Sequence, residues 1–170
     1  MSLWSQITDA LAREFSDVGD AGVATRVGVR LLTAALLGGA IGWERESVGK
    51  SAGLRTHMLV ALGSALFILA PVETGEDEQA TSRVIQGVVA GIGFLGAGAI
   101  VKSHAGDAVY GLTTAASIWI TAALGMAVAL GRVVTAIIAA VLALVILHVL
   151  PSATPNDNSR RNPKNHPDSS

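Results

Sequence analysis

The stretch from Gly87 to Val101, GVVAGIGFLGAGAIV, constrains the fold more than any other part of the chain. In a soluble helix each of its five glycines costs about 1 kcal/mol relative to alanine. The uncharged run that contains it is 18 residues long, whereas a strand usually has about 5 to 6. In a bilayer the backbone must pair internally, and small residues let helices approach closely. We therefore predict a central transmembrane helix rather than a buried soluble helix or strand, with other helices packed on Gly87, Gly91, Gly93, Gly96 and Gly98.

Charged side chains are scarce and unevenly distributed. They make up 15% of the 170 residues, against roughly 25% in a typical soluble domain. Five segments of 17 to 19 residues are almost free of charge, and each is long enough to cross a hydrocarbon core about 30 Å thick. These segments are Val27–Trp43, Thr56–Val72, Val84–Val101, Leu112–Leu130 and Val133–Leu150. The pattern predicts an all-α, polytopic membrane protein with about five transmembrane helices in a domain over residues 26–150.

The two ends of the chain have a different character. Residues 1–25 carry apolar side chains three or four positions apart, from Trp4 to Val18, with charged residues between them. This spacing predicts an amphipathic helix, which either lies at the membrane interface or packs on the edge of the bundle. Residues 151–170 are polar and without apolar periodicity, so we expect a disordered cytoplasmic tail.

A cluster of charged residues flanks the short loop between the first two spans. Glu44 and Arg45 end the first span, and Arg55 and Thr56 begin the second. Because the loop returns the chain at once, we expect Glu44 and Arg55 to pair near one membrane depth, supported by Arg45, with Thr56 as the N-cap of the second helix. We expect this cluster to be a functional site that is needed for regulation rather than for folding. The alternative is ordinary interfacial charge that anchors the helix ends.

Other polar and small residues fall within the spans. Arg30 lies about one turn inside the first span, where it either snorkels to the interface or reaches a partner in the bundle. Gly38 and Gly42 form a GxxxG pair, as do Gly87 and Gly91, which favours helix packing without distinguishing one chain from a homodimer. The start of the fourth span, Thr113, Thr114 and Trp119, is read as a further packing face.

The chain offers little for catalysis or cofactor binding. It has no cysteine, which excludes disulfides and thiolate chemistry. Ser64 lies within a span, but the histidines His57 and His148 lie at span ends, so we do not expect a serine protease. His104 and Asp107 favour a polar turn over a metal site. We predict no enzyme activity and no cofactor, assign no metal site, and see in the net charge of −1 no basis for nucleic-acid binding.

Four sequence blocks resemble the signature blocks of the MgtC/SapB family. They are GGAIGWERE from Gly38, AGLRTHMLVALGSALF from Ala52, GIGFLGAGAI from Gly91 and GLTTAASIW from Gly111. The resemblance covers about residues 30–130 and places Arg30, Glu44, Arg45, Arg55, Thr56, Thr113, Thr114, Trp119 and the glycines of the third block on family motif positions. It implies a bacterial inner-membrane protein connected with growth in low magnesium, here in a short form without the soluble C-terminal domain of longer members.

Two functions from different classes follow from this resemblance. The first is a regulator that contacts another membrane protein within the bilayer, since family members are described as restraining the proton-driven ATP synthase. The second is a transporter or channel for magnesium or another small ion, the role given to the family in older descriptions. Hard cations prefer oxygen ligands, and no Asp or Glu lies deep within a predicted span, so we favour the regulator.

The distribution of basic residues predicts the orientation of the spans. Seven Lys and Arg residues flank the side of the 44–55 loop and the tail, and five flank the other side. Because basic residues favour the cytoplasm, we expect the N-terminus outside and the tail inside. Reporters that are active only in the cytoplasm should therefore give signal when fused after Ser51 and after Ser152. Signal from only one fusion would contradict the number of spans, and signal from neither would reverse the orientation.

Overall fold

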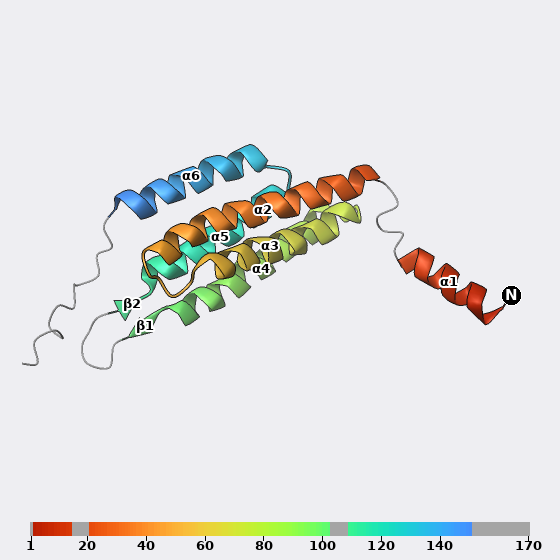
Figure 1. Ribbon diagram of the computed structural model, residues 1–170, viewed down its shortest axis with the longest axis horizontal. Coiled ribbons are helices and arrows are strands. Elements are labelled where there is room, and N and C mark those ends of the chain that lie inside the picture. Colours follow the sequence, from red (N-terminus) through yellow and green to blue (C-terminus); the bar gives the residue numbers. More distant parts are fainter. Residues whose placement is uncertain (1, 15–20, 103–108, 151–170) are drawn as a thin grey trace, which may run out of the picture.

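The computed structural model describes residues 2–14, 21–102 and 109–150. These residues form helices almost throughout, which confirms the predicted all-α class (Figure 1). The helices are α1 (Leu3–Glu14), α2 (Ala21–Ser47), α3 (Leu54–Glu73), α4 (Glu78–Ala99), α5 (Leu112–Ala129) and α6 (Val133–Val149). Two short strands, β1 (Val101–Lys102) and β2 (Val109–Tyr110), pair antiparallel between α4 and α5. The proposed tail and the His104–Asp107 stretch lie outside the described residues.

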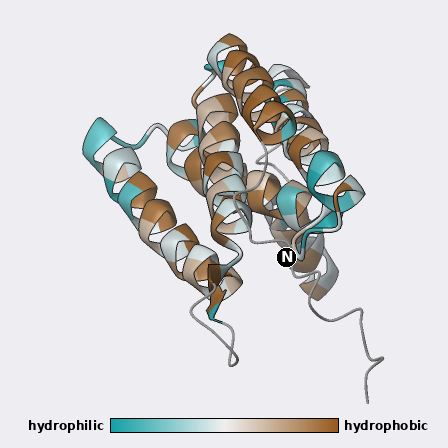
Figure 2. Cartoon of the chain, turned by 90° about the vertical axis from the view of Figure 1, so that its left-hand side faces the viewer, coloured by the Kyte–Doolittle hydropathy of each residue, from teal (hydrophilic) through white to brown (hydrophobic). Residues whose placement is uncertain are grey.

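Each of the five predicted apolar segments corresponds to one helix of the series α2 to α6. Within the described residues, α2, α3, α4 and α5 are long and apolar enough to cross a membrane, and α6 is an apolar helix of 17 residues. Hydrophobic residues run along most of the length of these helices (Figure 2). Helix α2 begins at Ala21, six residues before the predicted segment, and α4 ends at Ala99 because β1 follows.

The N-terminal helix α1 has the predicted amphipathic spacing. Its apolar side chains Leu3, Trp4, Ile7 and Leu11 are exposed in the described part of the chain. An exposed apolar stripe on a polar helix is suited to the membrane interface.

The central helix of the bundle is α5, which corrects the prediction made for the glycine-rich stretch. Helix α5 packs against α2, α3, α4 and α6, and half of its apolar window is buried, compared with 11% for α4. Helix α4 lies along one edge of the bundle and α6 along another (Figure 1). Small and hydroxyl residues on several faces of α5, such as Ser117, Thr121 and Ala122, are buried and allow four neighbours to approach it.

Glycines on α2 and α5 lie where helix backbones come closest. A Cβ atom added to Gly38 would stand 2.6 Å from the carbonyl oxygen of His57, and one added to Gly42 would stand 2.7 Å from the Cα of Leu54. One added to Gly125 would collide with the carbonyl oxygen of Ala61. The GxxxG pair of α2 therefore packs against α3 of the same chain.

The glycines of α4 have a different environment from the one predicted. A Cβ atom added to Gly87, Gly91, Gly93 or Gly98 would meet no described atom within 4 Å, and one added to Gly96 would make only ordinary contact with Ala115. The prediction that other helices of the chain pack on all five is wrong. Glycine content alone does not show which glycines are covered, because that depends on the direction each helix face takes in the bundle.

We predict opposite effects of alanine at Gly125 and Gly91. Gly125→Ala should lower the free energy of unfolding by about 1–3 kcal/mol, because the new methyl group overpacks the contact with Ala61. Gly91→Ala should leave stability equal or higher, because the site is open and alanine favours the helix by up to about 1 kcal/mol. Thermal unfolding of both variants in one detergent measures the difference. Equal melting temperatures would contradict the packing described for α5.

Candidate functional site

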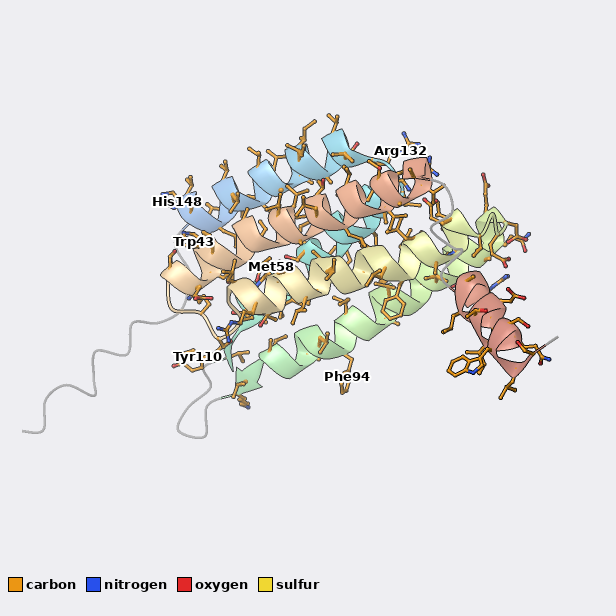
Figure 3. The ribbon with its side chains drawn as sticks, turned by 45° about the vertical axis from the view of Figure 1, so that its right-hand side comes forward. Trp43, Met58, Phe94, Tyr110, Arg132 and His148 are labelled. Atoms are coloured by element: carbon orange, nitrogen blue, oxygen red, sulfur yellow. The ribbon has the colours of Figure 1, made fainter. Side chains whose placement is uncertain are left out.

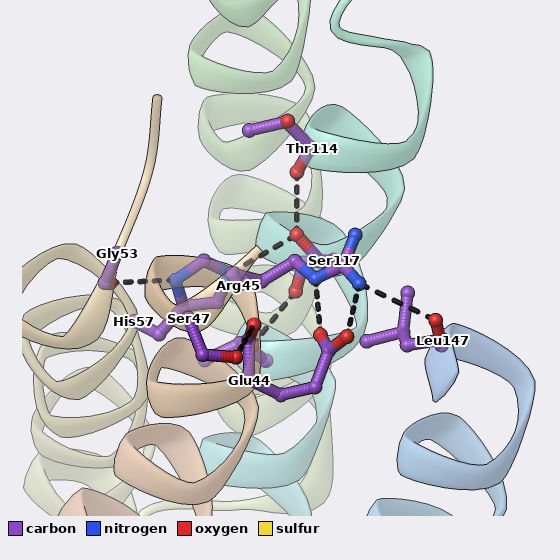
Figure 4. Close-up of polar contacts among 9 residues, drawn as sticks. Glu44, Arg45, Ser47, Gly53, His57, Thr114, Ser117 and Leu147 are labelled. Atoms are coloured by element: carbon purple, nitrogen blue, oxygen red, sulfur yellow. Dashed lines mark hydrogen bonds and ion pairs between the residues drawn. The ribbon is translucent and has the colours of Figure 1, made fainter. Parts of the chain in front are cut away.

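Four helix ends meet on the side of the bundle that holds the α2–α3 loop. They are the C-terminal ends of α2 and α6 and the N-terminal parts of α3 and α5 (Figure 4). Gly42 lets the first turn of α3 lie directly against α2. As a result, residues that are far apart in the sequence bring their polar groups together at this end.

Arg45 is the most deeply buried charged residue of the described chain, with 2% of its surface exposed. Its Nε and Nη2 groups donate to the two carboxylate oxygens of Glu44, and Nη2 also lies 3.5 Å from the carbonyl oxygen of Leu147 on α6. Its Nη1 group is buried without a partner among the described residues. A buried charge needs a partner to offset the loss of hydration, and Glu44 supplies it. We call Glu44 and Arg45 the buried charge pair.

The predicted pair between Glu44 and Arg55 does not form, because Arg45 takes the place of Arg55. Helix α2 continues to Ser47 and turns Arg45 into the bundle, where its long side chain folds back to the neighbouring carboxylate. Arg55 lies on the exposed side of α3 and forms no ion pair with a described residue. The short loop correctly predicted that Arg55 lies at the same end of the bundle as Glu44. It did not show that the Arg55 side chain lies on the exposed side of α3.

The start of α3 is held by Glu46, not by Thr56 as predicted. The N-cap of α3 is Gly53, and the carboxylate of Glu46 accepts the N–H of Leu54 at 2.8 Å. A Cβ atom on Gly53 would collide with that carboxylate. Thr56 lies in the first turn and is exposed. A carboxylate at this position also suits the positive end of the helix dipole.

His57 and Ser117 form a buried hydrogen-bonded chain that the sequence did not reveal. His57 is fully buried, with Nδ1 at 2.8 Å from the carbonyl oxygen of Gly53 and Nε2 at 3.0 Å from the hydroxyl of Ser117. The Ser117 hydroxyl in turn lies 2.8 Å from the carbonyl oxygen of Thr114. The only signal in the sequence was the four-residue spacing of Ser117, Thr121 and Gly125, which places small residues on one helix face.

The hydrogen bonds that link Gly53, His57, Ser117 and Thr114 are limited by the number of protons that these groups can donate. Both carbonyl oxygens can only accept, so Nδ1 of His57 must carry a proton to bond Gly53. With a neutral imidazole, Nε2 can only accept, and the single proton of the Ser117 hydroxyl is donated either to Thr114 or to Nε2, so the two hydrogen bonds do not form at the same time. The arrangement ties α3 to α5 by polar contacts that need both side chains.

Arg30 belongs to a second ion-pair group at the opposite end of the bundle. Its Nη1 lies 3.4 Å from the carboxylate of Glu73 on α3, and Arg26 contacts the same carboxylate at 3.3 Å. Of the two readings for Arg30, a partner in the bundle is therefore the one observed. Arg26 and Glu73 were not among the predicted site residues, although both lie near span ends.

The predicted packing face at the start of α5 is divided. Thr114 is buried, whereas Thr113 and Trp119 are exposed. Trp119 is 51% exposed, so a large part of its side chain is not covered by other helices of the described chain. Among the residues that the structure describes, no three His, Asp or Glu side chains are grouped as metal ligands. The arrangement at this end can hold charge and fix helix positions.

Comparison with known proteins identifies the group to which these features belong. The family model described as MgtC family matches residues 31–155, which is most of the chain. The chain belongs to the MgtC family. Membership of this family, together with the apolar helices, shows that the protein is a multi-pass membrane protein. The resemblance of the four sequence blocks is thereby confirmed.

Several members of the MgtC family are close in sequence. Protein SrpB of Synechococcus elongatus is 50% identical over 113 residues, which cover 60% of this chain and 62% of that protein. The putative magnesium transporter YhiD of Escherichia coli is 46% identical over 113 residues, covering 61% and 50%. Protein MgtC of Salmonella typhimurium is 45% identical over 109 residues, covering 64% and 46%. The chain spans about half of these relatives' length, and no solved structure matches it.

We predict that the buried charge pair contributes to stability and that Arg55 does not. Glu44→Gln should lower the free energy of unfolding by about 3–5 kcal/mol, because it leaves the guanidinium of Arg45 buried without its counter-charge. Arg55→Gln, the matched control, should change stability by less than about 0.5 kcal/mol, because that side chain is exposed. Thermal unfolding in detergent tests both. A larger loss for Arg55→Gln than for Glu44→Gln would restore the pairing predicted from the sequence.

Proposed function

We propose that this MgtC-family protein is a regulator of the bacterial inner membrane, which acts by contact with another membrane protein during adaptation to low magnesium or stress. The partner suggested by the family resemblance is the proton-driven ATP synthase. The proposed orientation has the N-terminus outside and the C-terminus in the cytoplasm. What supports the proposal is an uncovered helix face on α4.

This surface, the open α4 face, consists of Gly87, Gly91, Phe94 and Gly98. The four positions follow the spacing i, i+4, i+7 and i+11 and therefore lie on one side of the helix. The three glycines have open space in place of a side chain, and Phe94 is 81% exposed and points away from the bundle (Figure 3). Small residues on a membrane helix permit close approach of another helix, and the exposed aromatic ring offers an anchor beside them.

A groove beside the open α4 face enlarges the surface for a partner. It lies between α3 and α4, has a volume of about 810 Å³, and is lined by Gly63 and Phe67 of α3 together with Gly87 and Gly91. Side chains of a partner helix that packs on α4 can enter this groove. Such complementary packing is the main source of helix association in a bilayer, where hydrophobic burial gives no driving force.

Three carboxylates at the C-terminal ends of α2 and α3 are already bound, which argues against a cation pathway through them. Glu44 is bound by Arg45, Glu46 by the N–H of Leu54, and Glu73 by Arg26 and Arg30. A hard cation such as Mg²⁺ needs oxygen ligands that are free to coordinate it. The transporter function named for the relative YhiD stays the alternative for this chain.

Photocrosslinking from the open α4 face tests the proposed contact. A photoreactive phenylalanine analogue in place of Phe94 should give a crosslink to a membrane subunit of the ATP synthase in cells grown in low magnesium. The same analogue at Val141 is the matched control, because Val141 is exposed on α6, which lies along a different edge of the bundle from α4. Equal products from both positions would show that the contact is unspecific, and a crosslink to a second copy would favour a homodimer.

A flux measurement separates the regulator from the transporter. Liposomes that contain the purified protein should show no more Mg²⁺ entry than protein-free liposomes. In the photocrosslinking experiment, Gly91→Leu should abolish the crosslink from position 94, because the added side chain fills the open α4 face. Magnesium flux that depends on the protein would favour the alternative.

A further inference from the structure

A small cavity with a mixed polar and apolar lining lies at the end of the bundle that holds the α2–α3 loop, outside the open α4 face and its groove. It has a volume of about 290 Å³ and is formed by the loop residue Lys50 and by Tyr110, Gly111, Thr113 and Thr114, where β2 leads into α5, together with flanking residues. This volume is near the lower limit of small-molecule sites, which is about 300 Å³. The cavity therefore suits one compact group rather than a large ligand.

The N-terminus of α5 faces this cavity without a capping side chain. Its N-cap is Gly111, with φ of +89°, and no side chain accepts the free N–H groups of the first turn. Glycine is required at this position, because a Cβ atom would collide with the carbonyl oxygen of Ala99. The first N–H groups of an 18-residue helix carry partial positive charge and are suited to bind an anion.

Thr114 supplies an independent observation that points to a ligand. Its side chain lines the cavity and is 97% buried, since only 3% of the residue is exposed. Within the described residues its hydroxyl forms no hydrogen bond, whereas the hydroxyls of Ser117 and Thr121 donate to carbonyl oxygens of their own helix. A hydroxyl on the cavity wall that has no partner among the described residues can donate to an acceptor bound there.

The charge of the cavity lining favours an anion. Lys50 is its charged residue and forms no ion pair with a described carboxylate, and no acidic side chain is found among the described lining residues. Tyr110 and Thr113 add hydroxyl groups that can donate. Backbone N–H groups, hydroxyls and an ammonium group together match the oxygens of a phosphate.

We propose that this cavity binds a phosphate group, carried either by an anionic lipid headgroup or by a soluble ion. The amides of the first turn of α5 and the Thr114 hydroxyl donate to the phosphate oxygens, and Lys50 neutralises the charge. The site is independent of the proposed partner contact on α4.

Binding to the full-length protein in a neutral detergent tests this site. Native mass spectrometry compares phosphatidylglycerol, which is anionic, with the zwitterionic phosphatidylcholine, and calorimetry measures inorganic phosphate against chloride. Lys50→Gln and Thr114→Val should each weaken binding of the recognised phosphate about tenfold, which corresponds to one charge-assisted hydrogen bond. Lys102→Gln is the matched control, because Lys102 is an exposed lysine of β1, which pairs with β2 beside the cavity, and it is not among the residues that line the cavity.

The results distinguish a lipid phosphate from a soluble one and show whether the proposal fails. Preference for phosphatidylglycerol identifies a lipid, and binding of inorganic phosphate alone identifies a soluble ligand; either result supports the proposal when Lys50→Gln weakens it. Absence of both kinds of binding overturns the proposal, as does an equal loss in Lys102→Gln, which would indicate general attraction to basic residues. Lys50 lies in a loop, so its variant decides the result even if Thr114→Val alters the melting temperature.

Discussion

The close approach of helix backbones at Gly38, Gly42 and Gly125 is the contact on which the rest of the structure depends. A side chain at any of these positions would push α3 away from α2 or α5. The same approach places His57 against Ser117 and closes the bundle around Arg45. Buried polar groups are tolerated at this end of a membrane bundle only because tight packing brings their partners within bonding distance.

The sequence predicted the positions of the spans well but not the faces that they present to each other. Span positions follow from the length of uncharged segments, which is a local property. Burial of a face is not local: Gly125 is covered and Gly91 is open, although both lie in apolar helices rich in small residues. The pattern that made the 87–101 stretch appear central is therefore also compatible with an edge helix.

The sequence predicted correctly that Glu44, Arg45 and Arg55 lie at one end of the bundle. The spacing of these residues did not show which arginine pairs with Glu44. Glu44 had two arginines within reach, and the choice of Arg45 depends on the extra turn of α2 and on the carbonyl oxygen of Leu147, which comes from α6. The link between His57 and Ser117 joins residues 60 positions apart. Contacts of this kind depend on the tertiary fold, and a single sequence carries no signal for them beyond small-residue spacing.

The region around Arg45 and His57 is closely packed and hydrogen-bonded, whereas α4 has small residues that no other helix of the described chain covers. This difference is consistent with a structural role for the first region and a binding role for α4. Arg45 and His57 are buried and, apart from Nη1 of Arg45, hydrogen-bonded, and their contacts link α2 to α6 and α3 to α5. Helix α4 is joined to this frame through Ile92 and Gly96, while its remaining glycines face outward. A rigid frame that presents an open helix face can receive another helix without rearranging, so little conformational entropy is lost on binding. The proposed regulatory contact therefore requires no opening of the packed core.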